Sequence, residues 1–231
     1  MVLEFYYDLL SQPCRAVYFL LKCSGVQFKG QKVELLKGEH LTPEFLKKNP
    51  YHKVPVIFDD GFGLSESIAI MRYIAVKYKL ADHWFPRADL RTQARVEEFL
   101  NWQASAIRTP CITVFQGMLR DKVGVGAFTK QPMDVAKVKA AKEEITRAVT
   151  HIADYFLQDK QFVGGNKVSA ADILVVCELY QLHPVNQLDS LVKCNPKVKA
   201  WMERVEKALG PEWKAVNATI DSFREKYMTA K

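Results

Sequence analysis

No stretch of this sequence stays apolar over the ~20 residues that a membrane-spanning helix requires. The first residues also lack the basic segment followed by an apolar segment that marks a secretory signal peptide. These two absences argue against a protein of the membrane or of the secretory route. We therefore expect a soluble, cytoplasmic protein that has no membrane partner.

Paired cysteines and metal-ligand spacings are missing as well. The five histidines form no His-x-x-x-His pair and no cluster with cysteine, so we expect no metal site. The cysteines are odd in number and scattered, which favours reduced thiols over a disulfide framework; they are Cys14, Cys23, Cys111, Cys177 and Cys194.

Charge of one sign is not concentrated in any part of the chain. The formal net charge is +7, but residues 1–80 hold 11 Lys and Arg against 8 Asp and Glu, and the remainder hold 22 against 18. Basic residues spread in this way do not form the patch that binds nucleic acid. We expect no nucleic-acid partner and a mild positive field that attracts small anions.

The first 80 residues alternate between strand and helix patterns. β-Branched and aromatic runs bounded by turn residues indicate strands, and capped apolar runs indicate helices. The predicted order is strand 2–7, helix 14–23, strand 28–35, helix 43–48, strand 54–58, strand 62–64 and helix 66–79. This order, βαβαββα, predicts a thioredoxin-like α/β domain over residues 1–80.

Strand signals fade after residue 80. Residues 81–89 form a predicted linker, and residues 90–231 a predicted all-α domain. We expect a long helix over 90–119 that Pro110 ends or kinks, a loop over 122–132, and a capping box from Ser169 to Asp172. Further helices are predicted over 133–158, 173–182, 195–210 and 212–228.

Two neighbouring segments together suit a small acidic peptide. Val54 precedes Pro55 and is pushed towards extended geometry, so its backbone is able to pair with a peptide, and the X-Pro bond is able to be cis. Ser65, Glu66 and Ser67 then open a helix whose free N–H groups favour a carboxylate. A strand, turn and helix that serve folding alone remain an alternative.

Seven segments, in order, carry a resemblance to a known family. They are 8–18, 37–40, 53–55, 66–67, 82–86, 94–96 and 169–172. With these segments the chain resembles the cytosolic glutathione transferases, and the theta class most closely. The resemblance implies a glutathione-binding thioredoxin-like domain, a helical domain that lines the electrophile pocket, and a homodimer. It implies glutathione as a co-substrate and no cofactor.

Ser11 is the expected catalytic residue. Free thiols have pKa values near ~8.5, and the thiolate is the nucleophile. Lowering this pKa by about two requires ~2.7 kcal/mol of preferential thiolate stabilisation, which a hydroxyl donor and a helix N-terminus are able to supply. The alternative is that Ser11 serves only as a helix cap. Tyr7, the donor type of other classes, is expected to pack in the core.

Cys14 raises a redox alternative, since Ser11-x-x-Cys14 looks like a Cys-x-x-Cys motif that has lost its first sulfur. The exposed nucleophile of such motifs is the first position, which is serine here. We therefore expect Cys14 to be a small buried apolar residue.

The resemblance also assigns the glutathione contacts. His40 and Lys53 would hold the glycine carboxylate, and the Val54 backbone beside cis Pro55 would pair with the cysteinyl unit. Glu66 would hold the γ-glutamyl amine, and Ser67 would hold the γ-glutamyl carboxylate. Solvated side chains are the alternative for His40 and Lys53.

The electrophile contacts are implied less directly. Residues 102–108 match a theta segment in which Arg108 corresponds to an arginine that favours anionic leaving groups. Ser105 replaces an acidic residue of some family members. An ordinary ion pair is the alternative role of Arg108.

The expected function is conjugation of the glutathione thiolate to small hydrophobic electrophiles in detoxification. Alkyl halides, epoxides and peroxides are the expected classes. The alternatives are a non-catalytic transferase-like interaction scaffold, and a cysteine-type thiol transferase.

Overall fold

The computed structural model describes residues 2–123 and 132–226 of the chain. Its sheet has four strands in the order β2-β1-β3-β4. The first strand, β1 (Leu3–Tyr7), runs parallel to β2 (Phe28–Lys32) and antiparallel to β3 (Val56–Asp59), which pairs with β4 (Phe62–Ser65). The connection between the parallel strands is α1 (Gln12–Cys23), as a βαβ unit requires.

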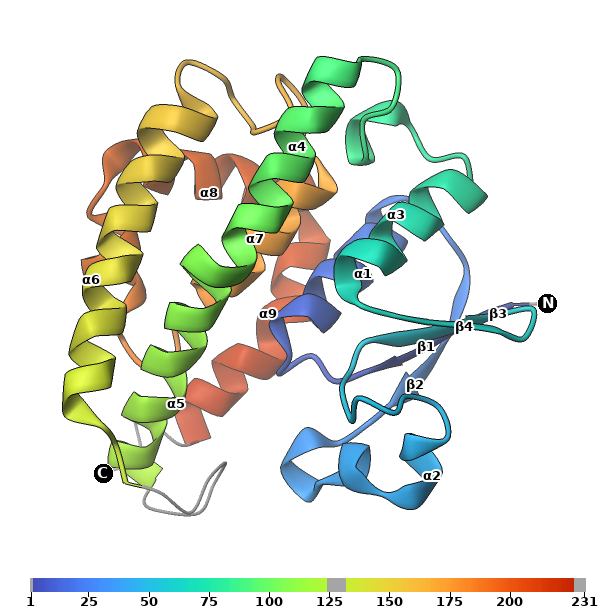
Figure 1. Ribbon diagram of the computed structural model, residues 1–231, viewed down its shortest axis with the longest axis horizontal. Helices are drawn as coiled ribbons and strands as arrows, with labels where there is room; N and C mark the ends of the chain where they lie inside the picture. Colours follow the sequence, from blue (N-terminus) through green and yellow to red (C-terminus); the bar gives the residue numbers. More distant parts are fainter. Residues whose placement is uncertain (1, 124–131, 227–231) are drawn as a thin grey trace.

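Helices cover both faces of this sheet (Figure 1). On one face α1 packs beside α3 (Ser67–Lys77), and Phe5 of β1 lies in their core cluster. On the other face Phe45 of the short α2 (Pro43–Leu46) packs with Val56. The expected thioredoxin-like domain is therefore confirmed.

The second half of the described chain is helical. A 3-10 turn at Asp82–Trp84 leads into it. Its helices are α4 (Leu90–Gln103), α5 (Thr109–Val123), α6 (Val135–His151), α7 (Ala170–Tyr180), α8 (Pro196–Leu209) and α9 (Pro211–Arg224). π-Helical turns follow α4 at Ala104–Arg108 and α6 at Ile152–Leu157, and a third lies at Asp189–Lys193.

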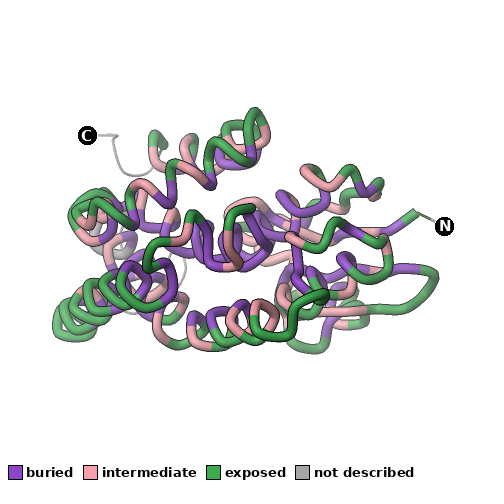
Figure 2. The backbone as a smooth tube through the Cα atoms, turned by 90° about the horizontal axis from the view of Figure 1, so that it is seen from above, coloured by how far each residue is buried: buried purple, intermediate pink, exposed green. Residues whose placement is uncertain are grey.

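The centre of the helical half is α7, whose residues from Ala170 to Leu179 are all buried. Figure 2 shows buried segments through the middle of the molecule and exposed ones along its outer helices. The predicted capping box is present: Ser169 accepts from the Asp172 N–H, and the Asp172 carboxylate accepts from the Ser169 N–H at 2.9 Å. The same carboxylate accepts from the Trp201 indole at 2.9 Å, which ties α7 to α8.

Pro110 does not end its helix. The chain continues through it from a π-helical turn over Ala104–Arg108 into α5. Proline has no N–H and its ring crowds the preceding turn, which a wider turn accommodates. The Thr109 hydroxyl donates back to the Ala104 carbonyl in the same turn, at 3.1 Å.

Two predicted segments differ from the structure in other ways. The second strand ends at Lys32, because Leu35 opens a 3-10 turn (Leu35–Lys37) and donates its N–H to the Asp8 carboxylate at 2.9 Å. Another 3-10 turn, Glu39–Leu41, follows. Most of the predicted loop over 122–132 falls outside the described residues. Within them, no helix is long and apolar enough to cross a bilayer, and no group of metal-ligating side chains gathers.

The two halves meet where α1 packs against α7. Arg15 is fully buried at this joint and carries a charge there. Its guanidinium donates to four acceptors at 2.8 to 3.2 Å, two just before Ser11 and two on or next to α7; they are the carbonyl oxygens of Leu9, Leu10 and Cys177 and the Gln181 Oε1.

Candidate functional site

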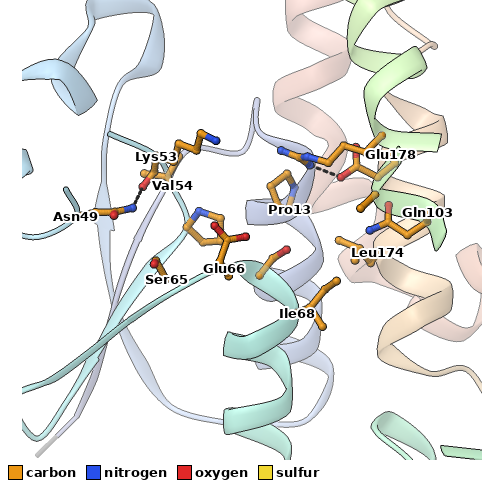
Figure 3. A pocket seen from close by; sticks show the side chains of 14 residues that line it. Pro13, Asn49, Lys53, Val54, Ser65, Glu66, Ile68, Gln103, Leu174 and Glu178 are labelled. Carbon is orange, nitrogen blue, oxygen red and sulfur yellow. Dashed lines mark hydrogen bonds and ion pairs between the residues drawn. The ribbon is translucent and has the colours of Figure 1, made fainter. Parts of the chain in front are cut away.

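A cavity of about 150 Å³ lies between the sheet half and the helical half. Figure 3 shows Lys53 and Val54 on one side of it, Gln103 and Glu178 on the other, and Pro13 between them. Six of the predicted site residues line this cavity together, namely Lys53, Val54, Pro55, Glu66, Ser67 and Arg108.

The turn before Pro55 is fixed by a buried side chain. Asn49 is 2% exposed, and its amide donates to the Lys53 carbonyl oxygen at 2.7 Å. The Val54–Pro55 peptide bond is cis. Among the described residues the Val54 backbone has no hydrogen-bond partner. Since buried backbone groups are normally paired, the backbone of this buried residue is open to a ligand.

Glu66 stands at the start of α3 in an unusual backbone conformation, with φ 69° and ψ 111°. Such a conformation costs ~1–3 kcal/mol for a residue with a side chain and persists where surrounding structure enforces it. Its side chain does not cap the helix. The carboxylate of Glu66 and the hydroxyl of Ser67 therefore both remain available on the cavity wall.

Two acceptors on the opposite wall were missed by the sequence prediction. Gln103 Oε1 and Glu178 Oε2 are buried and have no hydrogen-bond partner among the described residues. Burial raises the pKa of Glu178, and the charge of Arg108, which bonds its other oxygen, lowers it. Glu178 is the single charged residue in the apolar run 173–182, and this pattern could have pointed to it as a functional residue. No comparable pattern in the sequence marks Gln103. Acceptors of this kind suit a ligand with N–H donors.

Arg108 thus has the ion pair that was its alternative role, and it also lines the cavity. Its side chain is 35% exposed, whereas the Glu178 side chain is fully buried. The two roles are compatible, because a guanidinium has five N–H donors.

Ser11 and His40 line a second cavity, of about 210 Å³. The first turn of α1 separates the two spaces, since Pro13 lines the first while Ser11 and Gln12 line the second. The remaining walls of the second cavity are mostly apolar and come from α5, α9 and the residue after α7, together with Leu10 and Leu35; they include Ile112, Phe115, Gln181 and Phe223.

The Ser11 hydroxyl makes no cap hydrogen bond with α1, although Ser11 is the N-cap residue. It contacts the thiol of Cys14, which is fully buried as expected; burial raises the pKa of that thiol to about 12, and the Ser11 contact lowers it. A thiol with such a pKa stays protonated and is a weak acceptor for the Ser11 proton. The Ser11 hydroxyl is therefore able to turn to a stronger acceptor.

His40 has a buried Nδ1 atom without a partner among the described residues, and so has His52. Burial lowers the pKa of His40, the neighbouring His52 lowers it further, and Asp8 opposes them. An anion at this position would relieve that shift, because it stabilises the protonated ring.

Ser105 and Tyr7 lie apart from this arrangement. Ser105 lines a third cavity, with Trp102 and His151, outside the two that hold the other predicted residues. Tyr7 packs against the core as expected, stacked on Phe5 with ring centroids 4.9 Å apart.

Family models match both halves of the chain. The glutathione S-transferase N-terminal domain matches residues 5–76, and the glutathione S-transferase C-terminal domain matches residues 118–208. The chain belongs to the glutathione S-transferase family. Within the family it is a theta-class enzyme, as its curated relatives indicate. The transferase is 42% identical to mouse glutathione S-transferase theta-1 over 92% of its length and 85% of that protein. It is 40% identical to the human theta-1 protein over 92% of its length and 85% of that protein.

Solved structures of theta-class proteins have the same fold as this transferase. The apo form of human glutathione S-transferase T1-1 superposes with a TM-score of 0.88 at 36% identity, over 96% of this chain and 91% of that one. A human theta-class enzyme in complex with the glutathione conjugate of 1-menaphthyl sulfate gives 0.87 at 35% identity, over 98% and 90% of the two chains.

Proposed function

We propose that this theta-class transferase binds glutathione across the first turn of α1 and conjugates its sulfur to small apolar electrophiles. The observation that carries the proposal is the gathering of Lys53, Val54, Glu66 and Ser67 in one cavity, next to the Ser11 hydroxyl, which makes no cap hydrogen bond. The glutathione complex of a human theta-2 relative supports the first part.

In the proposed complex the γ-glutamyl end lies at the start of α3. The Ser67 hydroxyl and the N–H groups of the first turn bind its carboxylate, because a helix N-terminus carries partial positive charge. Its ammonium faces Glu66 and the unpaired oxygens of Gln103 and Glu178. Three side chains thus offer acceptors to an ammonium group, which has three donors to satisfy.

The rest of the tripeptide continues towards the second cavity. The cysteinyl backbone pairs with the unpartnered backbone of Val54, and the glycine carboxylate reaches Lys53 and His40. The sulfur then lies by Ser11, whose hydroxyl donates to the thiolate and stabilises it.

The second cavity receives the electrophile. Its apolar walls favour small hydrophobic molecules, and we propose alkyl halides, epoxides and peroxides as substrate classes. In each case the thiolate attacks an electrophilic centre that the cavity holds against it, so that part of the barrier is removed by proximity.

A panel of electrophiles tests this function. Alkyl halides, epoxides, hydroperoxides and sulfate esters are assayed with glutathione, and conjugate is measured by mass. The proposal requires turnover of at least one class that disappears when glutathione is replaced by its S-methyl derivative. Retention on immobilised glutathione without turnover of any class would instead support the interaction scaffold.

We further propose that the protein is a homodimer, as the family resemblance implies. Light scattering would then give about twice the chain mass of 26.4 kDa. A mass of one chain at micromolar concentration would contradict it.

A further inference from the structure

Gln181 lies directly after α7, and its side chain is held at the wall of the second cavity. The residue is 2% exposed and lines the cavity together with Ser11. Its Oε1 atom accepts a hydrogen bond of 2.8 Å from the Arg15 guanidinium. No role has been assigned so far to this polar group in a mostly apolar space.

The contact with Arg15 fixes which way the amide faces. A guanidinium only donates, so the carbonyl oxygen of Gln181 has to face Arg15 and the NH2 group has to face away from it. Arg15 is itself held by three backbone carbonyl oxygens, those of Leu9, Leu10 and Cys177. The orientation of the amide is therefore set before any ligand enters.

The NH2 group has no hydrogen-bond partner among the described residues. The NH2 group is not one of the fully buried polar atoms, so it is reached from the cavity that Gln181 lines, and a ligand there is able to accept from it. Gln181 therefore offers a preorganised donor beside the place where the sulfur is proposed to react.

We propose that Gln181 Nε2 donates to the oxygen atom on which charge develops when the transferase opens an epoxide. This inference rests on the proposed function and adds a substrate preference to it. The thiolate sulfur forms a bond to one ring carbon, and the bond from that carbon to oxygen breaks. Both electrons of the broken bond move to the oxygen, which then takes a proton from water to give the alcohol.

The surroundings of Gln181 strengthen this effect. Leu10, Phe115 and Phe223 are apolar walls of the same cavity, and a hydrogen bond to developing charge is worth more in less polar surroundings. The oxygen of an opening epoxide is a strong acceptor, whereas a departing iodide is large and weakly hydrogen-bonded. Gln181 should therefore favour epoxides over alkyl iodides of the same chain length.

The test compares kcat/KM for a 1,2-epoxyalkane and an alkyl iodide of equal length. Gln181→Glu keeps the acceptor for Arg15 and the side-chain shape, but it removes the NH2 donor. We expect the ratio of epoxide to iodide turnover to fall about 10- to 100-fold, with KM for glutathione changed less than about 3-fold. Gln116→Glu is the matched control, because it brings the same charge to another wall of the cavity; it should change both substrates by the same factor.

Gln181→Met serves if the glutamate variant does not fold, since it removes the donor without adding charge, and the same fall in the ratio is expected. An unchanged ratio in a folded Gln181 variant overturns the inference while the proposed function stands. Equal falls in the Gln181→Glu and Gln116→Glu variants overturn it too, because cavity charge would then explain both. A wild-type protein that conjugates neither substrate removes the proposed function, and this inference with it.

Discussion

The side-chain amide of Asn49 donates to the Lys53 carbonyl oxygen at 2.7 Å, and its Oδ1 atom accepts from the Tyr51 N–H at 3.0 Å. One buried side chain therefore closes the turn that leads into Val54. This turn positions Val54, whose backbone has no partner among the described residues, at the wall of the first cavity.

Removing this side chain should damage binding more than turnover. We expect Asn49→Ala to raise KM for glutathione about 10-fold and to lower the free energy of unfolding by about 1–3 kcal/mol, since two backbone groups lose a buried partner. Steady-state kinetics and urea denaturation measure the two effects. Tyr51→Ala is the control, because Tyr51 takes part through its backbone and is 64% exposed; equal KM values for both variants would contradict the account.

Arg108 should be needed for stability as well as for the cavity. Arg108→Gln leaves the fully buried carboxylate of Glu178 without its ion-pair partner, and we expect a loss of about 2–4 kcal/mol at pH 7.5. Urea denaturation of the variant and the wild type measures this loss.

The loss should shrink as the pH falls. A carboxyl group whose folded-state pKa is raised binds a proton more readily in the folded protein, so stability is lost as pH rises through that pKa and regained below it. At pH 5 the variant and wild type should be closer than at pH 7.5. When Arg108→Gln is combined with Glu178→Gln, the loss that the arginine substitution causes should no longer depend on pH. If the loss in the single Arg108→Gln variant is already constant with pH, Glu178 does not cause it.

Glutathione binding should depend on pH through His40. Its pKa is lowered in the free protein, so the ring is neutral at pH 7.5, and a bound carboxylate favours the protonated ring. Binding therefore takes up a proton, and affinity should rise as pH falls from 8 to about 5.5. S-Methylglutathione, which has no thiol, reports this effect alone in calorimetry.

The control for this experiment is another histidine. His40→Gln should flatten the pH profile, whereas His83→Gln should not, because the His83 ring is bonded to the Val168 carbonyl at 2.7 Å, outside the two cavities. A profile that persists in His40→Gln would assign the proton to a different group.

Asp172 should be the most sensitive single position for folding of the helical half. Its carboxylate accepts from the Val163 N–H, the Ser169 hydroxyl and the Trp201 indole at 2.9, 2.6 and 2.9 Å. We expect Asp172→Ala to cost more than about 4 kcal/mol, because several buried donors lose their acceptor at once. A thermal melt measures the change, and a loss below about 1 kcal/mol would contradict this reading.

Most of the sheet half was predictable because its sequence signals are local. The turn at Asp60 and Gly61 and the proline after Val54 each act within a few residues, and the fold follows them. The same holds in the helical half for the capping pattern at Ser169. The π-helical turn before Pro110 was not predictable, because a missing N–H allows both a kink and a widened turn.

The site was predictable in part for the same reason. Residues 53–55 and 66–67 are motifs of the sequence, and the structure brings them to one cavity. Gln103, Glu178 and Gln181 were missed because their roles come from long-range packing of α4 and α7 against the sheet half. Ser105 belongs to a matching segment, but its position on the helix takes it to a different cavity.

Ser11 is the centre of the proposed chemistry. Its alternative role is that of a helix cap, but its side chain makes no cap hydrogen bond in the structure. The most direct measurement is the pKa of the thiol of bound glutathione, followed by thiolate absorbance against pH. The account predicts about 6.5 in the wild type and in Tyr7→Phe, and a return to about 8.5 in Ser11→Ala. An unchanged value in Ser11→Ala, or a raised value in Tyr7→Phe, would contradict it.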